Sequence, residues 1–363
     1  MRLGLVCYPG LGGSGVVASE LAARLAERGH HVVMIATERP FRLDDSRVDF
    51  FPVELPSYPV YPHPFYTLAL AGAIRQAGQR FGLEVIHTHY AIPHAVAAEL
   101  AESGAALVHT LHGTDVNQLG LDPLYREITS RALVRAGGVS AVSSFLARQA
   151  QAVFGIRPAV IPNAVDLNRF YPRPRASREG FVLLHASNFR PIKRVPDIVR
   201  VFAKVAVQAP AKLLLLGDGP ERPEAARVAR DLGVAERVCF LDPVPHPELI
   251  IAEADLFLLH SQEESFGLAA LEALASGVPV VAARVGGLSE VVTNGQTGVL
   301  TEFGDLEAQA EAILSLLAGS AQIQAMGQAG RADAETRFNP ARVTARYEQF
   351  YAQALAVKSM NPD

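Results

Sequence analysis

Short apolar runs typical of buried strands alternate with segments of helical periodicity along almost the whole chain. In the first half, strand-like runs at 3–7, 31–36, 85–88, 106–111, 139–142 and 159–161 alternate with helical segments at 14–27, 65–80, 92–102, 124–135 and 144–153. In the second half, runs at 181–186, 212–216, 238–241, 256–259 and 278–282 alternate with helical segments at 195–207, 224–232, 247–254 and 268–275, and helices at 306–317 and 341–356 close the series. Apolar strands that are each followed by a helix indicate parallel sheets covered on both faces.

One segment interrupts this alternation. Residues 163–180 contain Pro172 and Pro174 among several arginines and show no periodic pattern. A segment of this kind near the middle of a chain is typical of a linker between domains. The sequence therefore predicts an α/β protein with two doubly wound domains, 1–165 and 166–340, and a cleft between them. In such sheets ligands bind beyond the carboxyl ends of the strands.

The composition excludes several classes of protein. Hydrophobic residues make up 49% of the 363 residues and charged residues 19%, which provides a large core and excludes disorder as the main state. The net charge of −4 leaves no global field that would draw the chain to nucleic acid or to anionic lipid. Cys7 and Cys239 both lie in apolar runs, so we expect buried free thiols in a reducing compartment. No apolar run approaches the ~20 residues of a membrane span and no targeting segment is visible, so we expect a cytoplasmic protein.

A glycine-rich loop, Gly10-Leu11-Gly12-Gly13-Ser14-Gly15, follows the first strand and opens the first helix. Glycines at a helix start allow a phosphate to approach the backbone N–H groups at the positive end of the helix. The loop also fits the G-x-G-x-x-G pattern of dinucleotide-binding domains, with Glu38 about 20 residues further on. The loop is therefore open to three interpretations: a tight turn, a dinucleotide site, or a loop that accommodates phosphate or sugar.

Two glutamates, Glu264 and Glu272, lie eight residues apart around the start of a predicted helix. On one straight helix this spacing would separate them by about 12 Å, whereas the carboxyl pair of a glycoside hydrolase lies about 5–9.5 Å apart. The spacing suits two acceptors that hold different hydroxyls of an elongated ligand such as a nucleotide sugar. The backbone N–H groups of Phe266, Gly267 and Leu268 would then face its phosphates. An acidic helix start followed by a surface glutamate is the alternative.

Two further segments follow strands directly. The first contains Asn188, Arg190, Lys193 and Arg194, and cations at the carboxyl end of a strand suit a pyrophosphate, although a solvated run of charges would look the same. The second, residues 111–115, contains His112, which could hydrogen-bond a substrate hydroxyl or serve a structural role.

A metal site is not indicated by the sequence. His87, His89 and His94 surround Tyr90, but neither a cysteine nor a carboxylate completes a ligand set. The Asp-x-Asp motif expected in many metal-dependent sugar transferases is also missing from the sequence. We therefore expect neither a metal nor another cofactor.

Several of these features together resemble the family-4 retaining glycosyltransferases. The residues that carry the resemblance are Asn163 to Asp166, Lys193, Gly217 to Glu221, Glu264 to Glu272, Gly286 and Gly287. The match spans about residues 1–350. It implies the GT-B fold, in which two Rossmann-like domains face each other across a deep cleft, and a C-terminal helix at about 340–357 that packs back on the first domain.

Within this family, the chain is similar to members that transfer N-acetylglucosamine from UDP-GlcNAc to the 2-hydroxyl of L-malate, the first step of bacillithiol biosynthesis. The segments that carry this similarity are 7–9, 12–15, 40–43, 89–95, 110–115, 187–190 with 193–194, and 264–268. The similarity implies a metal-independent, retaining transfer that releases UDP. A phosphate oxygen of the donor takes the acceptor proton in such a reaction, and no protein nucleophile is needed.

The resemblance also implies roles for single residues. Glu272 should hold the ribose hydroxyls, Glu264 the sugar hydroxyls, Lys193 the pyrophosphate and His112 the 6-hydroxyl of the sugar, so His112, Lys193 and Glu264 are the implied catalytic residues. Asn188 stands where the wider family usually has Arg, which leaves the pyrophosphate charge to Lys193 with Arg190 or Arg194. The implied donor-binding set is Gly12, Gly13, Asn188, Arg190, Lys193, Glu264, Phe266, Gly267, Leu268 and Glu272.

For the acceptor, the resemblance implies that Ser14, Tyr90 and Thr114 face L-malate. A dicarboxylate also calls for a cation in the first domain, and Arg131 and Arg126 are the candidates.

Three other functions remain open at the level of sequence. The first is a family-4 glycosyltransferase with a different sugar donor or acceptor. The second is an NAD-dependent oxidoreductase that uses Gly10 to Gly15 and Glu38, but this function leaves Glu264, Glu272 and Lys193 without a role. The third is a nucleotide-sugar sensor without catalysis. Leucine-rich helix faces such as 308–317 would serve either a homo-oligomer or the core.

Overall fold

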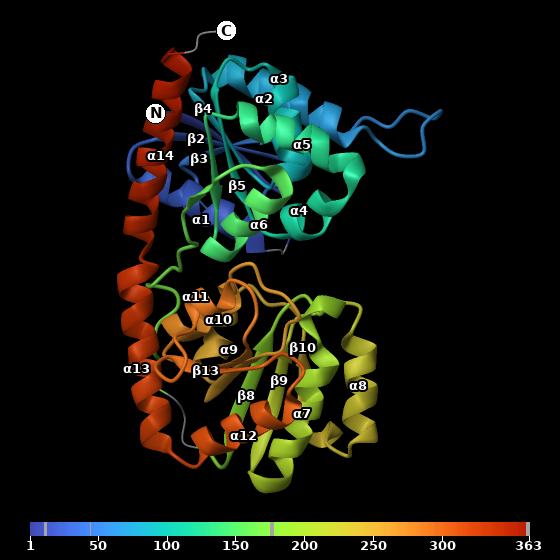
Figure 1. Ribbon diagram of the computed structural model, residues 1–363, viewed down its shortest axis with the longest axis vertical. Coiled ribbons are helices and arrows are strands. Elements are labelled where there is room, and N and C mark those ends of the chain that lie inside the picture. The colour runs from blue at the N-terminus through green and yellow to red at the C-terminus, as the bar shows by residue number, and fades with distance from the viewer. Residues whose placement is uncertain (11–12, 44, 175–177, 361–363) are drawn as a thin grey trace. The chain divides into compact units, whose positions relative to one another are not determined.

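A computed structural model of the protein describes residues 1–10, 13–43, 45–174 and 178–360 (Figure 1). The chain divides into two compact units: unit 1 contains Met1–Ala164 with Pro340–Asp363, and unit 2 contains Val165–Asn339. The division falls beside the boundary expected at residues 165 and 166.

Unit 1 contains a seven-stranded sheet in the order β3-β2-β1-β4-β5-β6-β7, and every pair of neighbouring strands is parallel. The strands are β1 (Arg2–Val6), β2 (His31–Ala36), β3 (Val48–Pro52), β4 (Val85–His89), β5 (Ala106–Leu111), β6 (Gly138–Ala141) and β7 (Ala159–Val160). The helices are α1 (Gly13–Glu27), α2 (Tyr66–Phe81), α3 (Val96–Ala101), α4 (Thr114–Asn117), α5 (Pro123–Arg135), α6 (Ser144–Phe154) and α14 (Pro340–Met360), with a π-turn at Ala91–Ala95 and a 3₁₀ turn at Leu119–Leu121.

Unit 2 contains a six-stranded parallel sheet in the order β10-β9-β8-β11-β12-β13. The strands are β8 (Phe181–Ala186), β9 (Ala211–Leu216), β10 (Val238–Leu241), β11 (Leu256–Leu259), β12 (Val280–Ala283) and β13 (Gly298–Thr301). The helices are α7 (Val195–Gln208), α8 (Arg222–Asp231), α9 (Pro247–Ala252), α10 (Leu268–Ala275), α11 (Leu288–Val291), α12 (Leu306–Leu317) and α13 (Ser320–Arg337), with 3₁₀ turns at Pro191–Lys193 and Ala235–Arg237.

The two sheets share one topology, which confirms the predicted α/β class with two Rossmann-like domains. In each sheet the strand order reverses once, between β1 and β4 in unit 1 and between β8 and β11 in unit 2. In doubly wound sheets this reversal opens a crevice at the carboxyl ends of the two strands, where ligands bind. We therefore expect functional residues in the segments that follow these four strands.

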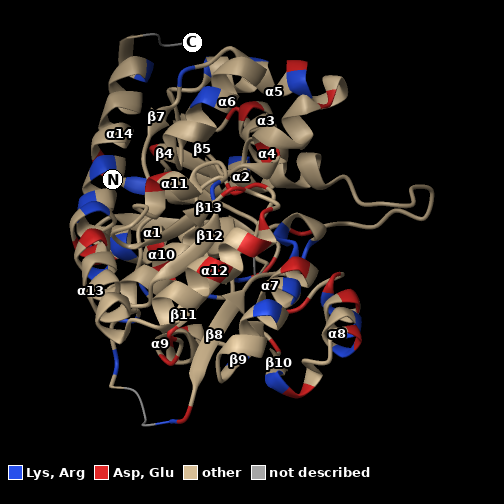
Figure 2. Cartoon of the chain, turned by 60° about the horizontal axis from the view of Figure 1, so that its bottom comes forward, with Lys and Arg blue, Asp and Glu red and all other residues tan. Residues whose placement is uncertain are grey.

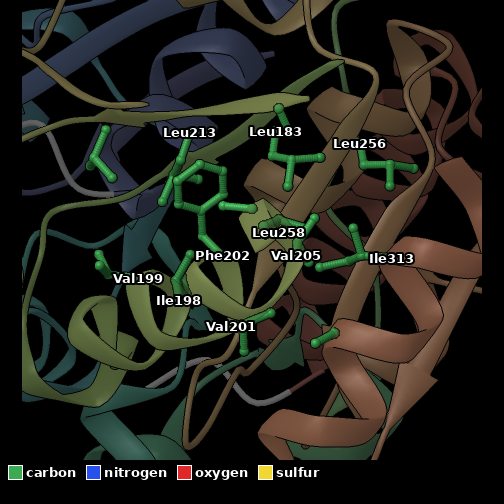
Figure 3. Close-up of a cluster of buried hydrophobic side chains, with 14 of the residues drawn as sticks. Leu183, Ile198, Val199, Val201, Phe202, Val205, Leu213, Leu256, Leu258 and Ile313 are labelled. Atoms are coloured by element: carbon green, nitrogen blue, oxygen red, sulfur yellow. The ribbon is translucent and has the colours of Figure 1, made fainter. Parts of the chain in front are cut away.

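The core of unit 2 lies between its sheet and the helices α7 and α12. Apolar side chains of β8, β9 and β11 meet Phe202 and Val205 of α7 and Ile313 of α12 in one buried cluster (Figure 3). The apolar face of residues 308–317 therefore belongs to the core, since Ala310, Ile313, Leu316 and Leu317 are all buried there.

The C-terminal helix α14 completes the core of unit 1. Tyr347, Phe350 and Tyr351 of α14 are buried against strands of the sheet. The helix approaches the sheet so closely that a Cβ atom at Gly138 would lie 2.7 Å from the Phe350 ring. Removal of this helix would therefore expose a large apolar surface of unit 1.

Helix α8 on the surface of unit 2 carries charges of both signs. Figure 2 shows acidic and basic residues along the ribbon of α8, and Arg227 of this helix pairs with Glu224 at 2.6 Å. Exposed pairs of this kind contribute little to stability, because solvent and salt screen them. Across the described ranges, no helix has both the length and the apolar character needed to cross a membrane.

Some elements differ from those expected. The helix expected at 92–102 begins only at Val96, because Ile92 precedes a proline and takes an extended conformation (φ −111°, ψ 122°). The strands β3 and β13 and the helix α13 were not predicted. β3 has the polar residue Asp49 and ends at Pro52 on the edge of its sheet, and α13 lacks a clear apolar stripe.

The expectation of two buried thiols was wrong for one of them. Cys7 is buried, and burial raises the pKa of its thiol to about 12. Cys239 is exposed, because β10 is the edge strand of its sheet.

Candidate active site

An ion pair lies at the carboxyl ends of β8 and β11 in unit 2. Lys193 ends the turn that follows β8, and Glu264 lies in the segment that follows β11. The Lys193 Nζ donates to Glu264 Oε1 at 2.6 Å, and the side chains keep 17% and 11% of their surface exposed. The hydroxyl of Ser261 donates to the same carboxylate oxygen at 2.9 Å. One ligand can therefore meet an ammonium group for its phosphate and a carboxylate for its hydroxyls.

Two glycines bring the segment after β8 into place. A Cβ atom at Gly217 (φ +131°) would lie 1.8 Å from the carbonyl oxygen of Ser187. A Cβ atom at Gly219 (φ +151°) would lie 2.2 Å from the carbonyl oxygen of Asn188. Only glycine permits both this backbone conformation and this close approach. The segment Gly217 to Gly219 thus supports the loop that carries Asn188 and Arg190.

A buried histidine fixes the start of the same loop, and sequence reasoning missed it. His185 Nδ1 donates to the carbonyl of Leu258 at 2.9 Å, so Nε2 accepts from the Ser187 hydroxyl at 2.8 Å. The Ser187 oxygen in turn accepts the N–H of Phe189 at 3.2 Å. Burial lowers the pKa of His185 to about 4, so the imidazole stays neutral and this bonding pattern is fixed. The sequence offers one signal for this role: His185 lies near the carboxyl end of β8, directly before the loop.

The cations of this loop differ in their partners. Arg194 Nε donates to Asp197 Oδ2 at 2.7 Å, so its charge is balanced by a carboxylate. Arg190 Nε donates to the amide oxygen of Asn188 at 3.3 Å, which is a neutral partner. The amide of Asn188, in the place of the family's usual Arg, therefore holds the side chain of Arg190 as a neutral partner.

The segment from Glu264 to Glu272 is not one helix, so the 12 Å estimate for a straight helix does not apply. Helix α10 begins at Leu268, after Gly267 at φ +97°. The ring of Phe266 packs edge-on against Phe338 at a centroid distance of 5.7 Å, so only its backbone is available to a ligand. Glu272 lies on α10 with 8% of its surface exposed.

In unit 1, the segments after β4 and β5 are joined through one buried carboxylate. Asp115 accepts the backbone N–H groups of Ala91 at 2.9 Å, Gly113 at 2.7 Å and His112 at 3.2 Å. Burial raises the pKa of Asp115, while these three hydrogen bonds act to lower it. This carboxylate orders the backbone around three predicted site residues, Tyr90, His112 and Thr114.

The aromatic rings at this edge are stacked. Tyr90 has a positive φ of 99°, which turns the chain after β4. Its ring lies parallel to that of His112, with centroids 5.8 Å apart and an interplanar angle of 16°. Tyr8, which follows β1, meets Tyr90 edge-on at 6.1 Å. The ends of β1, β4 and β5 therefore contribute to one aromatic surface.

Five histidines of unit 1 are neutral. Burial lowers the pKa of His94 to about 4 and those of His109 and His112 to about 3, and the pKa values of His87 and His89 lie well below the usual range for the same reason. These side chains hydrogen-bond one another, hydroxyls and backbone. In the described parts of the chain, no three histidine, cysteine or carboxylate side chains come together in a way that could hold a metal ion.

The glycine loop is described only in part. Gly12 lies outside the described residues, and helix α1 begins at Gly13, with Ser14 half-buried in its first turn. A Cβ atom at Gly15 would lie 2.6 Å from the carbonyl oxygen of Tyr8, so this glycine lets the helix start pack against the end of β1.

Arg131 lies elsewhere in unit 1. It occupies the third turn of α5, where its guanidinium lies 3.7 Å from Glu99 of α3 and 58% of its side chain is exposed. Both partners belong to the helix layer rather than to the segments that follow the strands. Its role toward the acceptor stays a prediction.

Models of two glycosyltransferase families match the chain. "Glycosyltransferase Family 4" matches residues 11–169 and "Glycosyl transferases group 1" matches residues 170–333. The N-acetyl-alpha-D-glucosaminyl L-malate synthase of Bacillus anthracis is 37% identical, over 98% of this chain and 97% of the relative. The D-inositol 3-phosphate glycosyltransferase of Thermobispora bispora is 31% identical, over 95% of this chain and 90% of the relative.

Solved structures share the fold. The sucrose-phosphate synthase of Thermosynechococcus elongatus has a TM-score of 0.83 at 23% identity and covers 98% of this chain and 100% of its own. The HepE protein of Anabaena, in complex with UDP and glucose, has a TM-score of 0.80 at 20% identity and covers 97% of this chain and 99% of its own.

Proposed function

The chain belongs to glycosyltransferase family 4, and on this premise we propose that it transfers N-acetylglucosamine from UDP-GlcNAc to the 2-hydroxyl of L-malate. The observation that carries the proposal is the 37% identity to an N-acetyl-alpha-D-glucosaminyl L-malate synthase over 98% of the chain. An alignment that runs through both units supports a shared acceptor as well as a shared donor.

The donor roles fall to unit 2. Lys193 and Arg190 bind the pyrophosphate, Glu264 binds the sugar hydroxyls and Glu272 the ribose. The ion pair between Lys193 and Glu264, at 2.6 Å, supports the roles of these two residues. It places a cation for the phosphate beside a carboxylate that can accept hydrogen bonds from the sugar hydroxyls. The N–H groups of Gly267 and Leu268 at the start of α10 add positive potential toward the phosphates.

The acceptor roles fall to unit 1. We assign Ser14, Tyr90 and Thr114 to L-malate and His112 to the sugar's 6-hydroxyl. The neutral state of His112 supports this assignment, because a neutral imidazole can hydrogen-bond a hydroxyl without holding a counter-ion.

Catalysis in this proposal is electrostatic. As the bond between the sugar and UDP breaks, negative charge grows on the departing phosphate, and Lys193 stabilises it. The acceptor attacks from the face that the phosphate leaves, and a phosphate oxygen takes the proton of its hydroxyl. The configuration of the sugar is therefore retained, and the reaction needs neither a metal nor a protein nucleophile.

The test is mass spectrometry of a mixture of the protein, UDP-GlcNAc and L-malate with EDTA present. We expect a product at the mass of GlcNAc-malate together with an equal amount of UDP. If UDP raises the melting temperature but no such product forms, the result supports a UDP-sugar donor and rejects L-malate as the acceptor. If neither occurs, the proposed function is wrong.

A different acceptor is the second candidate, and the inositol-phosphate relative supports it at 31% identity over 95% of the chain. A competition between L-malate and D-inositol 3-phosphate in the same mixture decides between them. Transfer to the inositol phosphate alone would replace malate in the proposal.

A further inference from the structure

One buried histidine in unit 1 has no part in the proposed reaction. His89 ends β4 and is completely buried, yet its Nε2 has no hydrogen-bond partner in the described structure. Its other ring nitrogen, Nδ1, lies 3.0 Å from Nε2 of His112. A buried nitrogen without a partner is unusual enough to require an explanation.

We propose that His89 is a positioning residue that fixes His112 in the tautomer with its proton on Nδ1, so that His112 presents an N–H donor to the ligand. The inference rests on the proposed role of His112 in sugar binding. It adds which way the hydrogen bond runs and which residue decides it.

The hydrogen bond between the two rings contains a single proton. Both imidazoles are neutral near pH 7, because burial lowers both pKa values far below that pH. Each ring therefore has one N–H group and one bare nitrogen. Nδ1 of His89 and Nε2 of His112 share one proton in this contact. The ring that donates it therefore determines where the protons lie on both rings.

The unpartnered nitrogen of His89 selects between the two arrangements. If His112 donated, His89 would carry its own proton on Nε2 and would bury an N–H group without an acceptor. If His89 donates, its Nε2 is a bare lone pair. Orphaned buried N–H groups are rarer than under-satisfied acceptors, so we assign the proton to Nδ1 of His89. Nε2 of His112 then accepts, and the proton of His112 lies on Nδ1.

The neighbours of His89 hold its ring in this orientation. Its own carbonyl accepts the Nδ1–H of His94 at 2.7 Å. Its ring packs against that of His87 at a centroid distance of 4.3 Å and an interplanar angle of 36°, and its edge meets that of His112 at the 3.0 Å hydrogen bond. Rotation of the ring would therefore disturb both the packing against His87 and the hydrogen bond to His112.

The direct test is nitrogen NMR of the unmodified protein labelled at histidine, with the His112 signals identified by their loss in His112→Asn. We expect the chemical shifts of the Nδ1–H tautomer for His112. The Nε2–H tautomer would overturn the proposal. This readout does not depend on turnover, so it stands even if the protein fails to transfer GlcNAc to malate.

A variant tests the role of His89 in catalysis. His89→Phe removes the donor and should leave His112 in a mixture of tautomers. We expect kcat to fall about 10-fold or more, as for other residues that orient a functional group, with UDP affinity unchanged. An unchanged kcat with folded protein would contradict the proposal.

The matched control is His109→Phe. His109 is equally buried and also has an unpartnered Nε2, but its Nδ1 bonds to Thr88 rather than to His112. We expect this variant to lose stability without a change in the tautomer of His112 or in kcat. Equal losses of kcat in both variants would show that burial of these imidazoles, and not orientation of His112, matters, and would overturn the proposal.

Discussion

The two units place very different chemistry at the ends of the same kind of sheet. In unit 2 the segments after β8 and β11 bring a half-buried ion pair, Lys193 with Glu264, and the guanidinium of Arg190, which hydrogen-bonds the neutral amide of Asn188. In unit 1 the segments after β4 and β5 bring stacked tyrosine and histidine rings whose imidazoles are neutral. The same topology thus presents charged side chains at the edge of one sheet and neutral hydrogen-bonding rings at the edge of the other.

This contrast predicts that acid affects unit 1 before unit 2. A histidine whose pKa is lowered in the folded state stays neutral there, while the unfolded chain binds a proton below its ordinary pKa of about 6.5. The contribution of such a histidine to the free energy of unfolding is therefore fully present above about pH 6.5, and it is lost as the pH falls toward the pKa of the folded state. For His94 and His109, with pKa values of about 4 and 3, the loss is about 2 kcal/mol each at pH 5.

The measurement is hydrogen exchange from pH 7.5 to pH 5, read separately in each unit. We expect amides of β4 and β5 to lose protection first, since five such histidines lie in unit 1. His109→Phe should flatten the slope of stability against pH by about 1.4 kcal/mol per pH unit, the value for one proton. Protection lost first in β8 and β11 would reverse the comparison.

A second prediction concerns the glycines that support the charged loop. Gly217→Ala places a methyl group 1.8 Å from the Ser187 carbonyl oxygen at φ +131°, so the loop must move. We expect a loss of about 3 kcal/mol or more in the free energy of unfolding, by urea titration, and a loss of UDP binding by calorimetry. Gly233→Ala is the control, because its φ is +69° but its methyl group would have no neighbour within 4 Å. It should cost about 1 kcal/mol and leave UDP binding intact.

The sequence predicted the alternation of strands and helices, and with it the edge of each sheet where these residues lie. It could do so because buried parallel strands are continuous apolar runs, as in β4 and β8. It failed for β3, an edge strand with Asp49 and Pro52, and for the start of α3, where a proline keeps Ile92 extended. In these places the local pattern was too weak or was overruled by backbone sterics.

The site was predicted unevenly for a similar reason. Lys193, Glu264 and His112 could be found because each follows a strand, and the topology fixes where strand ends lie. His89 and His185 could not be assigned their roles, because a hydrogen bond between side chains of neighbouring segments leaves no pattern in the sequence. The ion pair of Arg194 with Asp197, which distinguishes Arg194 from Arg190, could not be predicted from the sequence either.

The third prediction tests whether charge governs the donor half. Lys193→Ala should lower kcat/KM by about 100-fold or more, because in the proposed mechanism this cation stabilises the charge that develops on UDP. Release of UDP measures the rate. Lys204→Ala, on α7, removes an exposed ion pair with Glu307 of α12 and should leave the rate within about twofold. A nearly normal rate for Lys193→Ala would remove this residue from the mechanism.

The smallest expected effect tests the neutral half. Tyr90→Phe keeps the ring that stacks on His112 and removes only the hydroxyl. One lost hydrogen bond to a ligand is worth about 0.5–1.5 kcal/mol, so the KM for L-malate should rise about 3- to 10-fold while the affinity for UDP stays constant. Tyr125→Phe, on the exposed side of α5, is the control and should change neither constant. If Tyr90→Phe weakened UDP and malate equally, its hydroxyl would serve the fold of unit 1, and the acceptor role would pass to Ser14 and Thr114.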